Sequence, residues 1–170
     1  MRFTLSSSAF SSRLSTLSKV INSKNSLAIL DCFLFEVQNN QLTITASDSE
    51  NVLTTTLQLT ECDGEGRFAV NNKTILDAVR ELPEQPLTID VDTDNYTIKV
   101  VYQNGIYNFT AQNADEYPNV PTMGDEATSV VIPSGTLADS ISRSLFATAQ
   151  DELRPVMNGI YFDLTPECLA

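Results

Sequence analysis

Three aspartates at alternate positions are the most suggestive group of possible ligands in this sequence. Asp90, Asp92 and Asp94 have the spacing of the first three ligands of a calcium-binding loop. Such a loop needs glycine directly after the third ligand and closes on a glutamate, but these positions hold Asn95 and Val101. A strand that enters an Asp-Asn hairpin turn explains the same residues more simply. We therefore predict a turn here and no metal site.

Other candidates for catalytic chemistry are few. Asp48 and Glu50 could act as a carboxylate pair, although a polar turn between two strands explains them more simply. The 170 residues contain no histidine, which is the commonest general base and metal ligand. They also contain neither a GxxxxGK[ST] phosphate loop nor a GxSxG nucleophile motif. We expect no catalytic site and no cofactor, and predict that the protein is not an enzyme.

The charged side chains are unevenly distributed along the chain. Acids outnumber bases by 22 to 10, and a net charge of −12 at first argues against nucleic-acid binding. Residues 1–30, however, contain four bases and no acid, whereas residues 31–127 contain 17 acids and four bases. The sequence therefore predicts a polarised molecule whose first segment is basic.

The first segment contains an amphipathic helix that would present these bases. Apolar residues recur at helical spacing over residues 7–22, and the serines before and within its start favour a helix there. Arg13 lies on the flank of the apolar stripe and Lys19 lies opposite to it, both among small hydroxyl side chains. Such a face can lie near phosphates without gripping them, so we interpret it as facing nucleic acid. A merely solvated face is the alternative, and it would usually mix both charge signs.

The remaining pattern predicts short strands and a second helix. We expect the second helix after an N-cap at Asn71 and before Pro83. We expect strands over residues 3–5, 27–37, 42–45, 51–59, 67–70, 87–92, 96–102 and 106–111, with a polar turn at 61–66. Hairpin-linked strands covered by helices indicate α+β architecture.

The pattern then starts again with an offset of 127 residues and no gap. Phe10 and Leu14 fall on Leu137 and Ile141, and the apolar run 29–37 falls on residues 156–164. We predict one complete module at 1–122, a linker at 123–128 and the start of a second module at 129–170. Residues 130–170 should follow the strand–helix–hairpin path of residues 3–44. The second copy stops inside its first hairpin, so we expect a fragment of a longer protein.

The chain resembles a known family, the bacterial DNA sliding clamp or beta subunit of DNA polymerase III. The resemblance spans all 170 residues and is carried by short segments in the family's order, namely residues 2–5, 42–50, 73–83, 117–119 and 154–159. It implies the DNA-clamp fold, a repeated module of two helices packed on antiparallel sheets. It also implies a homodimeric ring of three similar domains per subunit, with helices lining the hole.

The resemblance also implies roles for individual residues. Lys24 and Gln150 match loop positions that touch DNA in the family. They add to Arg13 and Lys19 and to Arg143, which lies away from Leu137 and Ile141 in the second copy as the bases do in the first. One wall of the cleft that binds polymerase and clamp-loader peptides would be formed by Arg154, Pro155 and Met157. The subunit interface would include Thr74, Ala78, Leu82 and Ile106.

The function implied is that of a processivity factor in DNA replication. The ring would encircle double-stranded DNA without reading its sequence and would tether the polymerase III alpha subunit, with the clamp loader as a further partner. The alternative is an α+β binding or adhesion module with no nucleic-acid role. Three isolated cysteines, no export signal and no apolar run of about 18 residues favour a soluble cytoplasmic protein without a membrane partner.

Overall fold

The computed structural model describes residues 1–21, 25, 27–119, 129–149, 153–165 and 168. The chain divides into two compact units, Met1–Pro121 and Thr122–Ala170, and each is described by itself. Unit 1 contains two helices, α1 (Ser7–Leu17) and α2 (Asn72–Arg80). Its strands are β1 (Arg2–Ser6), β2 (Cys32–Gln38), β3 (Gln41–Ser47), β4 (Val52–Gln58), β5 (Glu61–Asp63), β6 (Gly66–Asn71), β7 (Pro86–Asp92), β8 (Thr97–Tyr102) and β9 (Gly105–Thr110).

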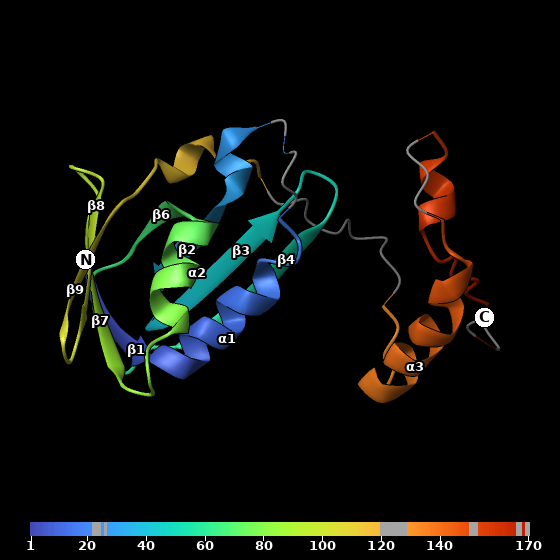
Figure 1. Cartoon of the computed structure of the whole chain (residues 1–170), viewed down its shortest axis with the longest axis horizontal. Helices are drawn as coiled ribbons and strands as arrows, with labels where there is room; N and C mark the ends of the chain where they lie inside the picture. Colours follow the sequence, from blue (N-terminus) through green and yellow to red (C-terminus); the bar gives the residue numbers. More distant parts are fainter. Residues whose placement is uncertain (22–24, 26, 120–128, 150–152, 166–167, 169–170) are drawn as a thin grey trace. The chain divides into compact units, whose positions relative to one another are not determined.

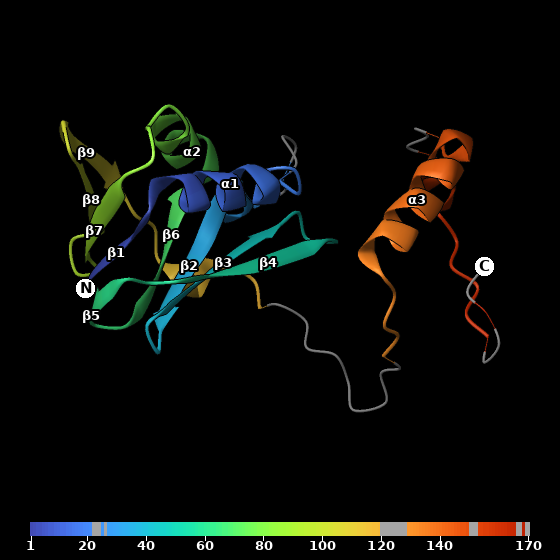
Figure 2. The ribbon, with the colours of Figure 1, turned by 90° about the horizontal axis from the view of Figure 1, so that it is seen from below.

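Unit 1 packs two antiparallel sheets against its two helices. One sheet has the order β5-β1-β7-β8-β9 and the other β4-β3-β2-β6. Figures 1 and 2 show α1 and α2 side by side as a layer over the strands. The core between these layers takes alternate residues from the strands and one stripe from each helix, including Phe10, Phe35, Phe68, Ile75 and Ile89. The predicted α+β fold is confirmed.

The topology of unit 1 consists of two similar halves. In each half a strand runs directly into a helix and is followed by three strands: β1-α1-β2-β3-β4 and β6-α2-β7-β8-β9. The first strand of each half pairs with the second strand of the other, β1 with β7 and β6 with β2, both antiparallel. The helices α1 and α2 pack against each other. Each half therefore completes the sheet of the other half, as in a pseudo-two-fold pair.

The two helices begin in the same way. The Ser6 side chain accepts a hydrogen bond from the Ala9 N–H at 3.2 Å, and the Asn71 side chain accepts one from the Thr74 N–H at 3.1 Å. Both bonds satisfy an N–H that has no partner inside the helix, so they fix the helix start. The predicted N-cap at Asn71 is confirmed.

Three predicted boundaries in unit 1 were wrong. Helix α1 ends at Leu17 instead of residue 22, because the N–H groups of Lys19 and Val20 bond three residues back and tighten the last turn. The predicted strand 27–37 begins as the 3-10 helix η1 (Ala28–Asp31). The polar segment 61–66 contains β5, which pairs with β1, so the pairing partner outweighs its low strand propensity.

Unit 2 forms the helices of the repeat without its strands. Helix α3 (Ser134–Ser144) and the 3-10 helix η4 (Pro155–Asn158) occupy the positions of α1 and η1 at the 127-residue offset. The expected strand path was wrong, because residues 130–132 and 159–163 have no strand assignment and Leu164 has only a single bridge. In unit 1 the equivalent strands pair with β7 and with β3 and β6.

Within the described part of the chain, no helix is long and apolar enough to cross a membrane.

Candidate nucleic-acid interface and subunit edge

Helix α1 buries one face and presents a basic, hydroxyl-rich one. Phe10, Leu14 and Leu17 are buried in the main core, whereas Ser12 and Arg13 are exposed. No acid occurs in the helix or before Asp31. The guanidinium of Arg13 therefore stands in a local sequence without a compensating charge and is available to a phosphate.

The other predicted DNA-facing residues of unit 1 lie just after this helix. Lys19 is exposed, in the tightened turn that follows Leu17. Lys24 lies outside the described residues, as does Gln150 of unit 2. Arg13 on α1 and Lys19 in the turn after it are thus both exposed.

An acid from the second half of the module reaches the first turn of α1. The Glu84 carboxylate accepts hydrogen bonds from the Ser6 hydroxyl at 2.9 Å and from the Ser8 N–H at 3.1 Å. Bonds from the side chains of Ser8 and Ser6 lower the pKa of Glu84, because they favour the charged form. The positive end of the α1 dipole is thus already matched by a carboxylate. Sequence analysis missed this contact because Glu84 is 76 residues away from Ser8 along the chain.

Most other charges of the β5–β1–β7–β8 region point away from the helices. Arg2 stands opposite Asp63 on one side and Asp90 on the other, and Asp90 stands opposite Lys99. Their strand neighbours Phe3, Ile89 and Ile98 are buried in the core that also contains Phe10 and Leu14. Because side chains alternate along a strand, the charged residues face the opposite, outer surface. Alternating opposite charges on this surface compensate one another in register.

Helix α2 adds a second row of exposed charges. Lys73, Asp77 and Arg80 are exposed, while Ile75 and Val79 are buried. The exposed three recur at i, i+4 and i+7, so they share one side of the helix. Lys73 and Arg80 were not among the predicted site residues, although the repeated strand–cap–helix pattern was a signal that they share a layer with Arg13.

The predicted subunit interface lies along α2 and the edge strand β9. Strand β9 is the last strand of its sheet and pairs on one side only with β8. Ile106 is 56% exposed and stands opposite Val101, which is also exposed. Thr74 is exposed, and Ala78 and Leu82 are half-buried. Unpaired edge groups beside exposed apolar side chains are typical of a strand that takes a partner.

Tyrosines extend this edge on its inner face. The rings of Tyr102 and Tyr107 stack with centroids 5.0 Å apart, and Tyr107 also contacts Phe109 at 6.1 Å. All three are only partly buried against the core. They were not among the predicted interface residues, although alternating aromatic residues in an edge strand were a signal for them.

Asp92 and Asp48, which were candidates for metal binding and catalysis, cap turns instead. Asp92 accepts hydrogen bonds from the N–H groups of Asp94 and Asn95, and the Asn95 side chain lowers the pKa of Asp92. Asp48 accepts bonds from the N–H groups of Glu50 and Asn51 in the same manner. The preferred hairpin-turn prediction is confirmed for Asp92. Among the described residues, no group of three or more potential ligands could hold a metal ion.

Arg143, Arg154, Pro155 and Met157, the predicted site residues of unit 2 that the structure describes, are exposed. Arg143 lies on α3, outside the groove formed by Leu137 and Ile141. The predicted peptide-cleft residues Arg154 and Pro155 are exposed at η4, and the N–H of Met157 donates to the Arg154 carbonyl at 2.9 Å. The turn presents the side chain of Met157, which is half exposed, but the other walls of a cleft would have to come from other residues.

Several solved structures share this fold. The DNA polymerase III subunit beta of Pseudomonas aeruginosa superposes with a TM-score of 0.90 and 24% identity, covering 99% of this chain and 45% of the other. A Helicobacter pylori beta clamp bound to a DNA ligase peptide gives a TM-score of 0.79 with 20% identity, covering 89% and 41%.

Curated relatives agree with the structural similarity. The beta sliding clamps of Halalkalibacterium halodurans and Haemophilus influenzae are each 28% identical to this chain, with 96% of this chain and 44% of each relative covered. The chain thus spans less than half the length of these relatives. Residues 1–121 match the family model described as DNA polymerase III beta subunit, N-terminal domain. The chain therefore belongs to the DNA polymerase III beta subunit family.

Proposed function

We propose that this chain is the front part of a DNA sliding clamp, a processivity factor without catalytic activity. The observation that carries the proposal is the charge pattern of unit 1 within this family. Helix α1 exposes Arg13, the turn after it exposes Lys19, and neither segment contains an acid; charged residues of the adjacent sheet lie on the opposite, outer surface. Sparse bases among hydroxyls suit a ring that surrounds DNA and slides, because such contacts are weak and screened by salt.

Assembly into a homodimeric ring is part of the proposal. We assign the subunit interface to Thr74, Ala78, Leu82 and Ile106. The unpaired outer edge of β9 and the exposed Val101–Ile106 pair support this assignment. The module boundaries are proposed as 1–122 and 129–170, with a linker at 123–128. A clamp works where chromosome and polymerase are, so we place it in the cytoplasm.

The partners other than DNA are proposed from a second surface. Arg154, Pro155 and Met157 are proposed as one wall of a cleft for peptides of the polymerase III alpha subunit and the clamp loader. Support comes from the exposure of this turn and from the Helicobacter pylori beta clamp, which was solved bound to a DNA ligase peptide. The proposed DNA contacts are Arg13, Lys19, Lys24, Arg143 and Gln150.

Charge reversal on two surfaces tests the DNA proposal. Binding to a fluorescent 20-base-pair duplex would be measured by anisotropy at about 10 mM salt, where the Debye length is about 30 Å. We expect weak, sequence-independent binding that Arg13→Glu/Lys19→Glu abolishes. Arg2→Glu/Lys99→Glu on the outer sheet changes the net charge by the same amount, serves as the matched control and should change affinity less than twofold. Equal losses in the two variants would contradict a DNA-facing α1.

A further inference from the structure

Unit 1 contains a second, smaller apolar cluster on the far side of one of its sheets. Leu34 of β2 stands opposite Ala69 of β6, and both are buried outside the main core. Their strand neighbours Phe33 and Val70 point into the main core, which α1 and α2 cover. Because side chains alternate along a strand, the smaller cluster lies on the face of the β4-β3-β2-β6 sheet that is turned away from the helices.

A short segment after β9 covers this smaller cluster. Residues 112–117, here called the strap, contain the 3-10 helix η2 (Ala114–Glu116). Figure 2 shows η2, in gold, on the other side of the strands from α1 and α2. Ala114 and Tyr117 point into the cluster and are each 4% exposed, and the thiol of Cys32 is buried beneath them. The strap therefore acts as the lid of a small core.

The strap is tied to the edge of the sheet by a pair of backbone bonds. The Gln112 N–H donates to the Ala69 carbonyl at 2.8 Å, and the Ala69 N–H donates to the Gln112 carbonyl at 3.1 Å. Another bond lies within the strap, where the Tyr117 N–H donates to the carbonyl of Ala114 at 3.1 Å. Bonds within the strap need not break when it leaves the sheet, so its release costs less than the release of a strand inside the ladder.

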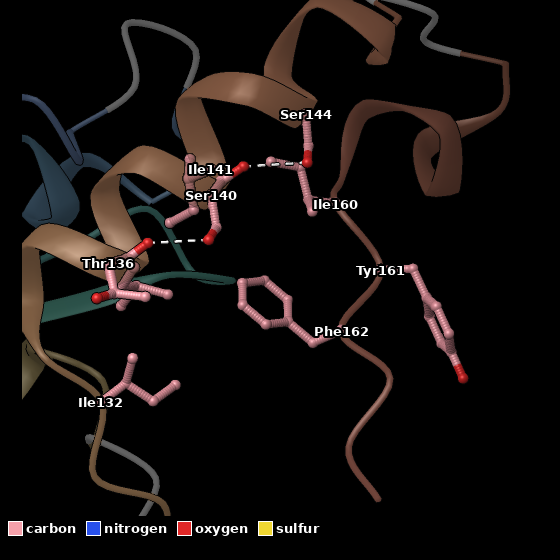
Figure 3. A pocket seen from close by; sticks show the side chains of 9 residues that line it. Ile132, Thr136, Ser140, Ile141, Ser144, Ile160, Tyr161 and Phe162 are labelled. Atoms are coloured by element: carbon pink, nitrogen blue, oxygen red, sulfur yellow. Dashed lines mark hydrogen bonds between the residues drawn. The ribbon is translucent and has the colours of Figure 1, made fainter. Parts of the chain in front are cut away.

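The phenol of Tyr117 is buried without an acceptor for its proton. Its oxygen has no hydrogen-bond partner among the described residues. Burial raises the pKa of Tyr117 to about 12; the backbone N–H of Ser47 acts in the opposite direction but is itself a donor and cannot take the proton. At the groove of unit 2, by contrast, Ser140 and Ser144 donate to the carbonyls of Thr136 and Ser140 (Figure 3). A buried donor without a partner favours an open strap, in which water accepts the proton.

A hollow beside the Tyr117 ring leaves room for the ring to move. It has a volume of about 240 Å³ and is lined by Tyr117 and Pro118 together with Leu27, Ser47 and Val52, among others. Side chains in a closely packed core are held on all sides, whereas a ring with such a space next to it can turn out of its cluster without displacing the strands. The closed strap is therefore held less firmly than the elements around the main core.

We propose that the strap opens and closes while the rest of unit 1 stays folded. Opening uncovers Cys32, Leu34 and Ala69 and frees the N–H and the carbonyl of Ala69 at the sheet edge. The six residues of the strap then lengthen the connection that follows them by up to about 20 Å, since an extended residue spans about 3.3–3.6 Å. The strap is thus an adjustable anchor for the chain that leaves unit 1. This inference does not depend on the proposed role in DNA binding.

Labelling of Cys32 measures the opening. Burial raises the pKa of Cys32 to about 11, so the closed strap keeps the thiol protonated and out of reach at pH 8. In the full chain with Cys62→Ser/Cys168→Ser, its reaction with iodoacetamide would be followed by mass spectrometry in up to about 2 M urea. We expect labelling at least tenfold faster than global unfolding allows, with less than roughly a quarter of its urea dependence, because opening the strap exposes little surface. Labelling with the full urea dependence of global unfolding would overturn the proposal.

Variants of Tyr117 test what holds the strap. Tyr117→Phe removes the hydroxyl without a partner and keeps the ring, so it should slow the labelling of Cys32 about tenfold. Tyr117→Ala removes the ring and should speed labelling at least tenfold. Tyr96→Phe, in an exposed turn of the same unit, is the matched control and should leave the rate within about twofold.

The urea midpoint of each variant, followed by circular dichroism, separates loss of the strap from loss of the fold. Unchanged or faster labelling in Tyr117→Phe would contradict the role given to the phenol. A rate in folded Tyr117→Ala equal to that of the Tyr96→Phe control would refute the strap itself. If Tyr117→Ala does not fold, the urea dependence of the unsubstituted ring and the direction of the Tyr117→Phe effect still decide the proposal.

Discussion

Residues 2–38 and 129–165 share one pattern but form different amounts of structure. The helices coincide to the residue: α1 and η1 of the first region reappear as α3 and η4 in the second. Strands β1 and β2 do not reappear. Helical hydrogen bonds close within four residues, whereas β1 and β2 draw their bonds from β5, β7, β3 and β6. In this module a strand therefore forms only where its pairing partners are present, even when its own sequence has the strand pattern.

The largest expected difference concerns two equivalent phenylalanines. Phe35 is 1% exposed and stacks on Phe68 at 5.1 Å, whereas its equivalent Phe162 is 49% exposed. Phe35→Ala should lower the free energy of unfolding by about 3–5 kcal/mol, because it leaves a cavity in a closed core. Phe162→Ala should change it by less than about 1 kcal/mol. Urea unfolding at low protein concentration, followed by circular dichroism, measures both. Similar losses would mean that the two regions are packed alike.

Helix capping should give an intermediate effect. Ser6 caps α1 through its side chain, whereas the equivalent position before α3 is Pro133, which makes no capping bond. Ser6→Ala should destabilise unit 1 by about 1 kcal/mol. Pro133→Ser should stabilise α3 by a comparable free energy. The gain would be seen as a higher helix content, measured as a more negative ellipticity at 222 nm. No gain in the second variant would show that α3 begins for a reason other than its cap.

The smallest effect should be the pH dependence that Glu84 gives to unit 1. The Ser8 and Ser6 bonds lower the pKa of Glu84 in the folded protein. Its contribution to the free energy of unfolding is therefore present above the unfolded pKa, near 4.3, and is lost as the pH falls through the folded pKa. Glu84→Gln should flatten the dependence of the unfolding free energy on pH below about pH 5. Between pH 7 and 8 it should leave the slope of that dependence unchanged. A profile of unaltered slope would contradict the assigned bonds.

Much of the fold was accessible from sequence because it depends on local pattern. The stripe Phe10-Leu14-Leu17 and the cap at Asn71 specify their helices through residues three or four apart. Strand β5 was missed because its pairing with β1 joins residues about 60 positions apart. The strands expected in 130–164 failed for the matching reason, since the apolar run is there but the described residues of unit 2 form no strand beside it.

The candidate site was predictable to a similar extent. Arg13 and Lys19 follow from helical spacing and are exposed as expected. The carboxylate of Glu84 at the first turn of α1, and the stacked Tyr102–Tyr107 pair at the edge, arise from contacts between elements. No spacing rule within one element could have indicated them. The roles proposed for Arg154, Pro155 and Met157 came from the family resemblance and from no spacing within the chain.

Residue-resolved hydrogen exchange tests the central claim, that the strands of this module form only with their partners. The measurement should be made at sub-micromolar concentration, where copies of the chain are apart. We predict that the amides of β2 and β7 exchange through global unfolding, at least 10³-fold more slowly than unprotected amides. Residues 160–164 should exchange within about tenfold of the unprotected rate, although they carry the pattern of β2. Protection of residues 160–164 equal to that of β2 would contradict the claim.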